Sequence, residues 1–274
     1  MFKKLYLVGL VCCLLAPSSA FAEKGKLSFT PYMGAIAATS RDMVDSASLS
    51  VSDAQTWSDG SQLSAKFRAD VKSQSFQDTH DTPLLTGFDI GYFIKDDLEV
   101  FGGFQYVQAG GNTTKAGDIT AAFTFTDSGG SSTSVGATDT VNGTFDDYKS
   151  WALKVGATKY FPMQTFTTYA GGYAGFKHVD SMNVKLTLVT ADVSGTIKFY
   201  DATNTGFFGF HTGANKEIDL GGTALIMGVR ARLDYTPELN DNDSDTSLVT
   251  NGSGTNNAGG GVDFGLTAQL SIPF

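Results

Sequence analysis

The last segment of the chain alternates between apolar residues and polar or small ones. The apolar positions are Val262, Phe264, Leu266, Ala268, Leu270, Ile272 and Phe274, separated by Asp263, Gly265, Thr267, Gln269 and Ser271. Successive side chains of a β-strand point to opposite sides, so this period of two predicts a strand with one apolar face.

The same period recurs along most of the chain. Strands are expected at 26–37, 86–94, 98–108, 148–161, 165–177, 205–214, 222–235 and 261–274. Residues 184–189 and 196–200 also look extended, which leaves ten strands open beside eight. Pro31 lacks a backbone donor and residues 170–172 are small, so we expect bulges or closely approaching backbones at these two places.

The connections between these strands alternate in length. Those at 39–85, 109–147, 178–204 and 236–260 are long, whereas those at 95–97, 162–164 and 215–221 are short. A soluble sandwich would also show alternating strands, but it has no reason to sort its loops by side. The sequence therefore predicts an all-β fold, an antiparallel transmembrane up-and-down β-barrel with eight strands (ten possible), long extracellular loops and short periplasmic turns.

The first 22 residues have the layout of a secretory signal peptide. Lys3 and Lys4 precede an apolar run at 5–16, and Ala20-Phe21-Ala22 is an A-x-A cleavage pattern. The apolar run is shorter than the roughly 20 residues that a membrane-spanning helix needs. We expect cleavage after Ala22, which leaves one barrel domain at 23–274 and removes the cysteines at 12 and 13.

Composition narrows the classes of function. A mean hydropathy of −0.06 excludes a helical protein with many membrane spans, and 41% hydrophobic residues argue against wholesale disorder. With 28 acidic and 19 basic residues the net charge is −9, and Lys and Arg are not clustered. Nucleic acid is therefore not expected as a partner, because phosphate binding needs such clusters.

The expected signal peptide, the alternation of loop lengths and the final strand ending in Phe274 resemble the small outer-membrane barrels of Gram-negative bacteria, of the OmpA, OmpX and Opa type. The resemblance is one of pattern rather than of matched residues. It implies location in the outer membrane, contact with its lipid and lipopolysaccharide, and folding by the barrel-assembly machinery. In that family the terminal pattern is the assembly signal, here at Leu266, Leu270, Ile272 and Phe274; the alternative is a terminal aromatic that packs on a sandwich edge.

Alternation also separates an outer face from an inner one. Expected outward aromatics near strand ends, where membrane barrels carry girdles, are Tyr106, Trp151, Phe161, Phe208, Phe210, Tyr235 and Phe274. The charged residues expected inside are Asp89, Glu99, Lys154, Arg230, Arg232 and Asp263. Side chains fill an eight-stranded barrel, and charges buried there must pair. We expect a plug in which Arg230 and Arg232 pair with Glu99, Asp89 or Asp263; a narrow pore is the alternative.

Three segments resemble chemical sites. Residues 241–245 copy the start of a calcium loop, but Thr246 and Gly252 replace the glycine and glutamate that an EF-hand requires, so only a loose site stays open. His178, Asp180 and His211 could meet across a hairpin, yet no catalytic motif surrounds them. The Gly/Ser run at 129–134 lacks the residues of a phosphate loop and is expected to be flexible.

The long loops hold about half of the exported chain, and loops of this length are usually functional or disordered. They are rich in acids, among them Asp53, Asp59 and Asp139. We therefore expect a structural or adhesive surface protein that contacts host or surface ligands through its loops, without enzyme activity, metal or cofactor. A small porin-like channel is the first alternative, and a barrel enzyme acting on lipid A or peptides is the second.

Overall fold

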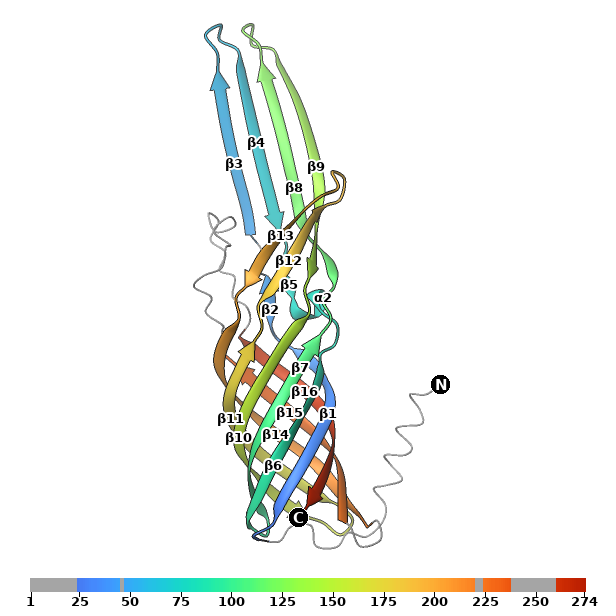
Figure 1. The fold of residues 1–274 in the computed structure, drawn as a ribbon. Coiled ribbons are helices and arrows are strands. Elements are labelled where there is room, and N and C mark those ends of the chain that lie inside the picture. Colours follow the sequence, from blue (N-terminus) through green and yellow to red (C-terminus); the bar gives the residue numbers. More distant parts are fainter. Residues whose placement is uncertain (1–23, 45–46, 220–223, 238–259) are drawn as a thin grey trace, which may run out of the picture.

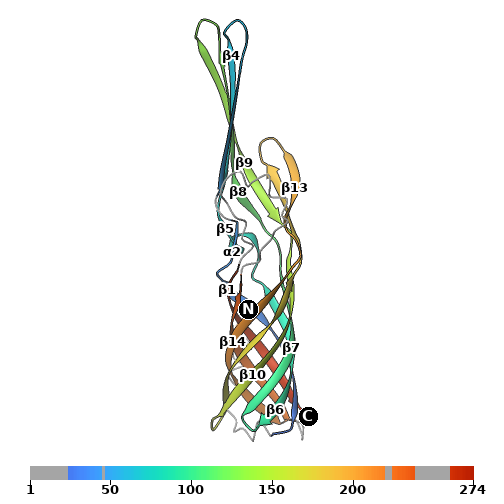
Figure 2. The same ribbon diagram turned by 90° about the vertical axis from the view of Figure 1, so that its left-hand side faces the viewer.

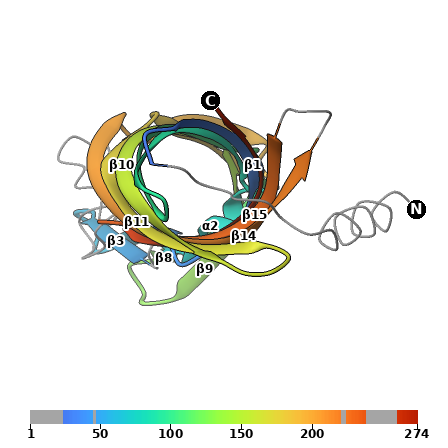
Figure 3. The ribbon, with the colours of Figure 1, turned by 90° about the horizontal axis from the view of Figure 1, so that it is seen from below.

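Eight strands close into one antiparallel barrel in this computed structural model, which describes residues 24–44, 47–219, 224–237 and 260–274. The barrel strands are β1 (Leu27–Thr39), β6 (Leu84–Lys95), β7 (Leu98–Ala109), β10 (Tyr148–Pro162), β11 (Thr167–Val179), β14 (Thr203–Asp219), β15 (Ala224–Thr236) and β16 (Gly261–Pro273). Each pairs with its neighbours in chain order and β1 pairs with β16, so the ring is complete (Figures 1 and 3). The predicted fold of eight strands is confirmed.

Every barrel strand presents apolar residues outward. In β10, Leu153 and Val155 are exposed whereas Ala152 and Lys154 are buried. Further exposed apolar residues lie all around the barrel: Phe29, Met33, Phe88, Ile90, Phe176, Phe208, Phe210, Val229, Leu233, Phe264 and Leu266. A closed ring leaves no unpaired strand edge, and an apolar outer band of this kind is stable against lipid. The barrel is therefore a transmembrane one.

The two ends of the barrel differ. The short connections 96–97 and 163–166 lie at one end, and the chain terminates there (Figure 1). Phe274 completes the last ladder, because its backbone N–H donates to Leu27 O and the Leu27 N–H donates to Phe274 O, both at 3.0 Å. The long connections leave from the other end.

The expected bulges occur elsewhere, whereas the close approach expected at 170–172 is present. The register of β1 with β6 runs through Pro31 without a shift, and β11 pairs regularly with both neighbours across 170–172. Shifts lie instead between Ile36 and Ala38, and between Phe93 and Lys95. The small residues do allow close approach: a Cβ on Gly171 would lie 2.4 Å from Ala157 O and 2.6 Å from His211 Nε2.

Three of the long connections are not loops, which corrects the expectation. They form a second sheet in the order β13-β12-β9-β8-β4-β3, here called the distal sheet. Its strands are β3 (Ala47–Thr56), β4 (Gln62–Val71), β8 (Thr113–Thr126), β9 (Ser132–Phe145), β12 (Met182–Leu188) and β13 (Val193–Tyr200). Residues 184–200 thus belong to this sheet, and the alternative of ten barrel strands is wrong. The run at 129–134 is a tight turn followed by the start of β9 rather than a flexible loop.

The distal sheet projects along the barrel axis, and the hairpins β3–β4 and β8–β9 reach beyond β12–β13 (Figures 1 and 2). Between barrel and sheet lie a small sheet of β2 (Asp42–Val44) with β5 (Gln74–Ser75), and helix α2 (Phe76–Thr79). Asp78 caps α2 by accepting hydrogen bonds from the Ser75 N–H at 3.0 Å and the Ser75 Oγ at 2.7 Å.

One apolar cluster joins these layers. It comprises Tyr32, Ile36, Met43, Phe76, Leu85, Val107, Ala109, Phe145, Tyr148, Val179, Met182, Val184 and Phe199. Among the described residues no helix is long and apolar enough to cross a membrane. The expected signal peptide and the acidic segment 241–245 lie outside the described residues.

Candidate functional site: the barrel interior and the distal sheet

The six charged residues expected inside the barrel are all buried. Asp89, Glu99, Lys154, Arg230, Arg232 and Asp263 expose between 3% and 9% of their surface. Alternation along the sequence was enough to predict their inward position, because each lies two or four residues from other inward positions of its strand. The structure shows which of them meet.

The central contact joins three of the expected residues. Asp89 on β6 accepts a hydrogen bond from Arg230 on β15 at 2.7 Å and forms a salt bridge with Lys154 on β10 at 2.9 Å. The Lys154 ammonium also lies 4.8 Å from the ring centroid of Tyr32 and 5.0 Å from that of Tyr173. One carboxylate thus balances two cations that aromatic rings enclose.

The other pairings differ from those expected. Arg232 pairs with Asp234 on its own strand, and Tyr173 donates a hydrogen bond to that same carboxylate. Asp263 pairs with Arg41 rather than with Arg230 or Arg232. Arg41 follows β1 in a connection and had no place in a strand pattern, so alternation could not identify it.

Glu99 lies nearest the short-turn end of this set and has no salt bridge among the described residues. The Ser28 hydroxyl and the Tyr160 hydroxyl donate hydrogen bonds to its two oxygens, the latter at 2.6 Å. Of the three acids expected as partners of Arg230 and Arg232, Asp89 pairs with Arg230, whereas neutral hydroxyl donors serve Glu99 instead.

The interior is filled in two ways. The cavity between Asp89, Glu99 and Arg230 measures about 10 Å³, which is the space of a single water. Toward the long-connection end, the apolar cluster described above covers the charged layers, with Phe76 of α2 in it. The cavity between the charged side chains is thus smaller than a hydrated ion.

The histidines do not meet. His211 points into the barrel and hydrogen-bonds Thr158 at 3.0 Å, whereas His178 lies near the distal end, stacks on Trp151 and contacts Asp180 at 3.4 Å. Sequence reasoning passed over the third histidine, His80, which lies against α2.

His80 connects α2 to the base of the distal sheet. Its Nε2 donates to the Asp146 carbonyl at 3.1 Å, its Nδ1 pairs with the Thr79 hydroxyl at 2.9 Å, and its ring stacks on Phe76. Burial lowers the pKa of His80 below its ordinary value. Burial thus favours the neutral form of this side chain, which acts as a structural contact.

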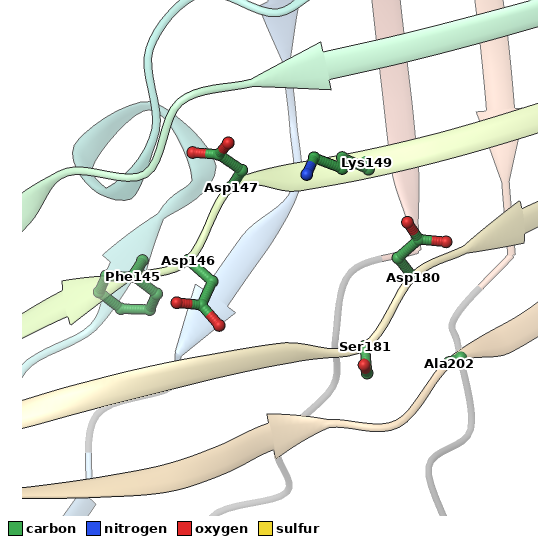
Figure 4. A pocket seen from close by; sticks show the side chains of 7 residues that line it. All are labelled: Phe145, Asp146, Asp147, Lys149, Asp180, Ser181 and Ala202. Atoms are coloured by element: carbon green, nitrogen blue, oxygen red, sulfur yellow. The ribbon is translucent and has the colours of Figure 1, made fainter.

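An open, acidic pocket of about 590 Å³ lies at the junction of barrel and distal sheet (Figure 4). Its carboxylates are Asp146, Asp147 and Asp180, and Lys149 stands beside them. Asp146 is already engaged by the Asn183 side chain at 2.9 Å. No group of three potential metal ligands gathers anywhere in the described part of the chain.

The distal sheet has two chemically different faces. Register places Val51, Phe67, Ala121 and Ala137 in one row across its strands, and Ala65, Phe123 and Val135 in the next. We call this the apolar face. The polar face carries hydroxyl pairs between β8 and β9: Thr120 with Thr138, Thr124 with Ser134, and Thr126 with Ser132.

The apolar face is uncovered by any described residue over its outer part. Exposed fractions are 46% for Phe67, 44% for Phe123, 45% for Phe125 and 68% for Val135. Toward the barrel it leads to an apolar cavity of about 230 Å³, bounded by Val71, Ile119, Phe145, Leu186 and Phe199, among others. This signal was present in the sequence, because residues 63–71 and 119–125 alternate like the barrel strands.

No protein-family profile and no curated protein matches this chain. Among solved structures, Neisserial surface protein A matches with 11% identity and a TM-score of 0.35, over 90% of this chain and 97% of its own. Ail of Yersinia pestis matches with 11% identity and a TM-score of 0.36, over 92% and 99%. The N-terminal β-barrel domain of Pseudomonas aeruginosa OprF matches with 12% identity and a TM-score of 0.31, over 92% and 98%. At these values none of them assigns a family or an activity to this chain.

Proposed function

We propose that this protein is an outer-membrane surface protein of a Gram-negative bacterium, in which the barrel is the anchor and the distal sheet makes the contacts. The carrying observation is the exposed apolar face on an ordered sheet outside the membrane barrel. Contiguous apolar surface of this kind usually marks a site of interaction. The function is structural or adhesive, directed at host or surface ligands, with lipopolysaccharide around the barrel.

The final strand supports the rest of this assignment. The final strand presents Leu266, Ile272 and Phe274 outward, where the barrel-assembly machinery could reach them during folding. The short turns then face the periplasm, and the distal sheet stands outside the cell. Cleavage of the signal peptide after Ala22 belongs to the same proposal.

The filled interior argues against the porin alternative. An ion crossing the barrel would have to separate the contacts of Asp89 with Lys154 and Arg230, and then pass the apolar cluster around Phe76. Single-channel recording in planar bilayers tests this directly. We expect no discrete conductance steps from purified protein, and regular steps would make the protein a channel.

We also propose that the protein is not an enzyme. The two histidines considered for catalysis point to different sides of the barrel wall, and no described nucleophile, base and orienting group stand together. Lipid A and peptides incubated with wild type and with the variants His178→Ala and His211→Ala would reveal activity. Turnover that these variants lose would overturn the assignment.

The interaction function is tested by shortening the distal sheet in register. Leu49 pairs with Ala69, and Ile119 pairs with Asp139, so residues 50–68 and 120–138 can each be replaced by an Asn-Gly turn. The base of the sheet and the apolar cluster stay intact. We expect a barrel that still shifts on gels upon heating but no longer binds cultured cells, matrix proteins or lipopolysaccharide. Equal binding by full-length and shortened protein would refute a role for the distal sheet.

A further inference from the structure

The apolar face of the distal sheet has no covering among the described residues, and its layout indicates what covers it. We propose that it docks a second copy of this chain, face to face, so that two distal sheets form one two-layer β-sandwich. This inference rests on the proposed interaction function and names its partner. It concerns the outer part of the face, where the hairpins β3–β4 and β8–β9 reach beyond β12–β13 (Figure 2).

Charge on this face lies at the sides and not in the middle. The central strands β4 and β8 contribute only apolar or small residues to it: Leu63, Ala65, Phe67, Ala69 and Val71 from β4, and Gly117, Ile119, Ala121, Phe123 and Phe125 from β8. Its two acids, Asp53 and Asp139, stand on the flanking strands β3 and β9. An apolar centre with a polar rim is the usual anatomy of a protein–protein interface.

Large and small side chains alternate across the face. Phe67 is followed across the sheet by Ala121 and Ala137, whereas Ala65 in the adjacent row is followed by Phe123. Phe67 and Phe123 contact each other edge to face at 5.8 Å and leave the alanines as neighbouring depressions. A two-fold axis placed between the two rows sets the phenylalanines of one copy against the alanines of the other, and the isologous contact repeats the same pairing in the opposite direction. Sheets with the same twist pack at about −30° in this way.

The available area suits such a contact. The strands β3 and β4 are each 10 residues long, and four strands lie side by side. With a rise of about 3.3 Å per residue and a strand spacing of about 4.8 Å, the face covers roughly 500–600 Å² per copy. Two copies bury roughly 1,100 Å², just above the area that separates biological interfaces from incidental contacts. The dimer is therefore weak in dilute detergent and is favoured where the membrane concentrates the protein.

A lipid surface fits the face less well. The two hairpins carry Asp53, Asp59, Asp70, Asp118, Asp127 and Asp139 against Lys66, Arg68 and Lys115. Their net charge is negative, whereas binding to an anionic bilayer depends on basic residues. A second copy needs no such residues, since the acids stay at the rim, in water.

Adjacent alanines on opposite faces of β8 give a matched test. Ala121 lies in the middle of the apolar face, and Ala122 points to the polar face. Each is changed to cysteine separately, as Ala121→Cys and Ala122→Cys, in a full chain with Cys12→Ser and Cys13→Ser. The proteins are reconstituted in lipid vesicles and treated with a short bis-maleimide. We expect at least tenfold more cross-linked dimer from Ala121→Cys than from Ala122→Cys.

A second pair of variants separates docking from collision. Phe67→Ser with Phe123→Ser should reduce the Ala121→Cys dimer to the level of the Ala122→Cys control, whereas Lys66→Ser with Thr124→Ser on the polar face should leave it unchanged. The gel shift upon heating confirms that each variant is folded. Sedimentation equilibrium of wild type in detergent should show a monomer–dimer equilibrium that the Phe67→Ser, Phe123→Ser variant lacks.

Three outcomes would overturn the inference. Equal cross-linking from both faces would mean random collision. Monomeric protein at all concentrations would leave the apolar face without a second copy. With the barrel already held in nanodiscs, binding of the monomer to added protein-free vesicles that the Phe67→Ser, Phe123→Ser variant lacks would assign the face to lipid. Loss of cell or matrix binding on shortening the distal sheet, with no dimer at any concentration, would retain the proposed function and remove only this partner.

Discussion

Asp89 is the residue on which the closed interior depends most. Its carboxylate lies 2.9 Å from Lys154 Nζ and 2.7 Å from Arg230 Nη1, and all three side chains are buried. The variant Asp89→Asn keeps the shape of the side chain and removes its charge. Two buried cations then remain without their shared counter-ion.

The expected loss of folding stability in Asp89→Asn follows from these two contacts of the carboxylate. Removing one partner of a buried ion pair costs about 3–5 kcal/mol, because the remaining charge is left uncompensated in a low-dielectric interior. A change of this size lowers the ratio of folded to unfolded protein by a factor of roughly 10² to 10³ or more. Arg230→Gln should cost less than Asp89→Asn, since Asp89 then keeps its contact with Lys154.

Urea titration of the protein in lipid vesicles measures this loss of folding stability. Folded and unfolded fractions are separated on gels without heating, and the unfolding midpoints are compared. Asp97→Asn is the control, because Asp97 pairs with Lys159 at the surface near the short turns and both side chains are more than 40% exposed. Exposed pairs contribute little to stability. If Asp89→Asn and Asp97→Asn lower the midpoint equally, the buried network does not hold the barrel together.

Three further results are expected. Deleting Phe274 removes both the outward terminal aromatic and the hydrogen bonds to Leu27, so the folded outer-membrane fraction should fall; unchanged yield and heat shift would contradict the assembly role. Phe76→Ala should lower the free energy of unfolding by about 3–5 kcal/mol in urea titration, because a buried ring is lost from the apolar cluster. A decrease under about 1 kcal/mol would show that the apolar cluster does not hold α2 in place. His80 has a lowered pKa, so the unfolded segment binds a proton before the folded one does, and docking of α2 should weaken as pH falls below about 6.5. Hydrogen exchange of residues 76–79 between pH 7.5 and 5.5 should show this in wild type but not in His80→Gln, whose amide cannot titrate.

The barrel could be predicted from the sequence because lipid imposes a simple rule. Outward positions such as Leu153 and Val155 must be apolar, and inward ones such as Lys154 need not be, so alternation identifies both strand and side. The salt-bridge partners of the inward charges were harder to predict, because the contacts between side chains depend on how far neighbouring strands are staggered along the barrel axis. Arg230 reaches Asp89 across the interior, whereas Arg232 finds Asp234 on its own strand.

The distal sheet was missed although it follows the same alternation. Leu63, Ala65 and Phe67 are interleaved with Ser64 and Lys66 as clearly as in any barrel strand, but threonine, serine and glycine surround them and loops were expected from the connection lengths. A long connection between membrane strands is free to be irregular, since water satisfies its backbone. An apolar period of two in such a connection therefore has a different cause from one inside the barrel.

On the distal sheet, the cause of the apolar alternation is functional. In the barrel, an outward phenylalanine such as Phe210 is stabilised by lipid, whereas Phe67 and Phe123 face water on a sheet whose other side is already satisfied by paired hydroxyls. A cross-strand aromatic pair such as Phe67 with Phe123 stabilises a sheet by only about 0.2–1 kcal/mol, whereas exposed aromatic residues make the sheet prone to association. Their presence along both central strands, with charge kept to the flanks, is accounted for when the surface is covered in the working state. The distal sheet is thus half of a layer structure, and a second distal sheet supplies the other half.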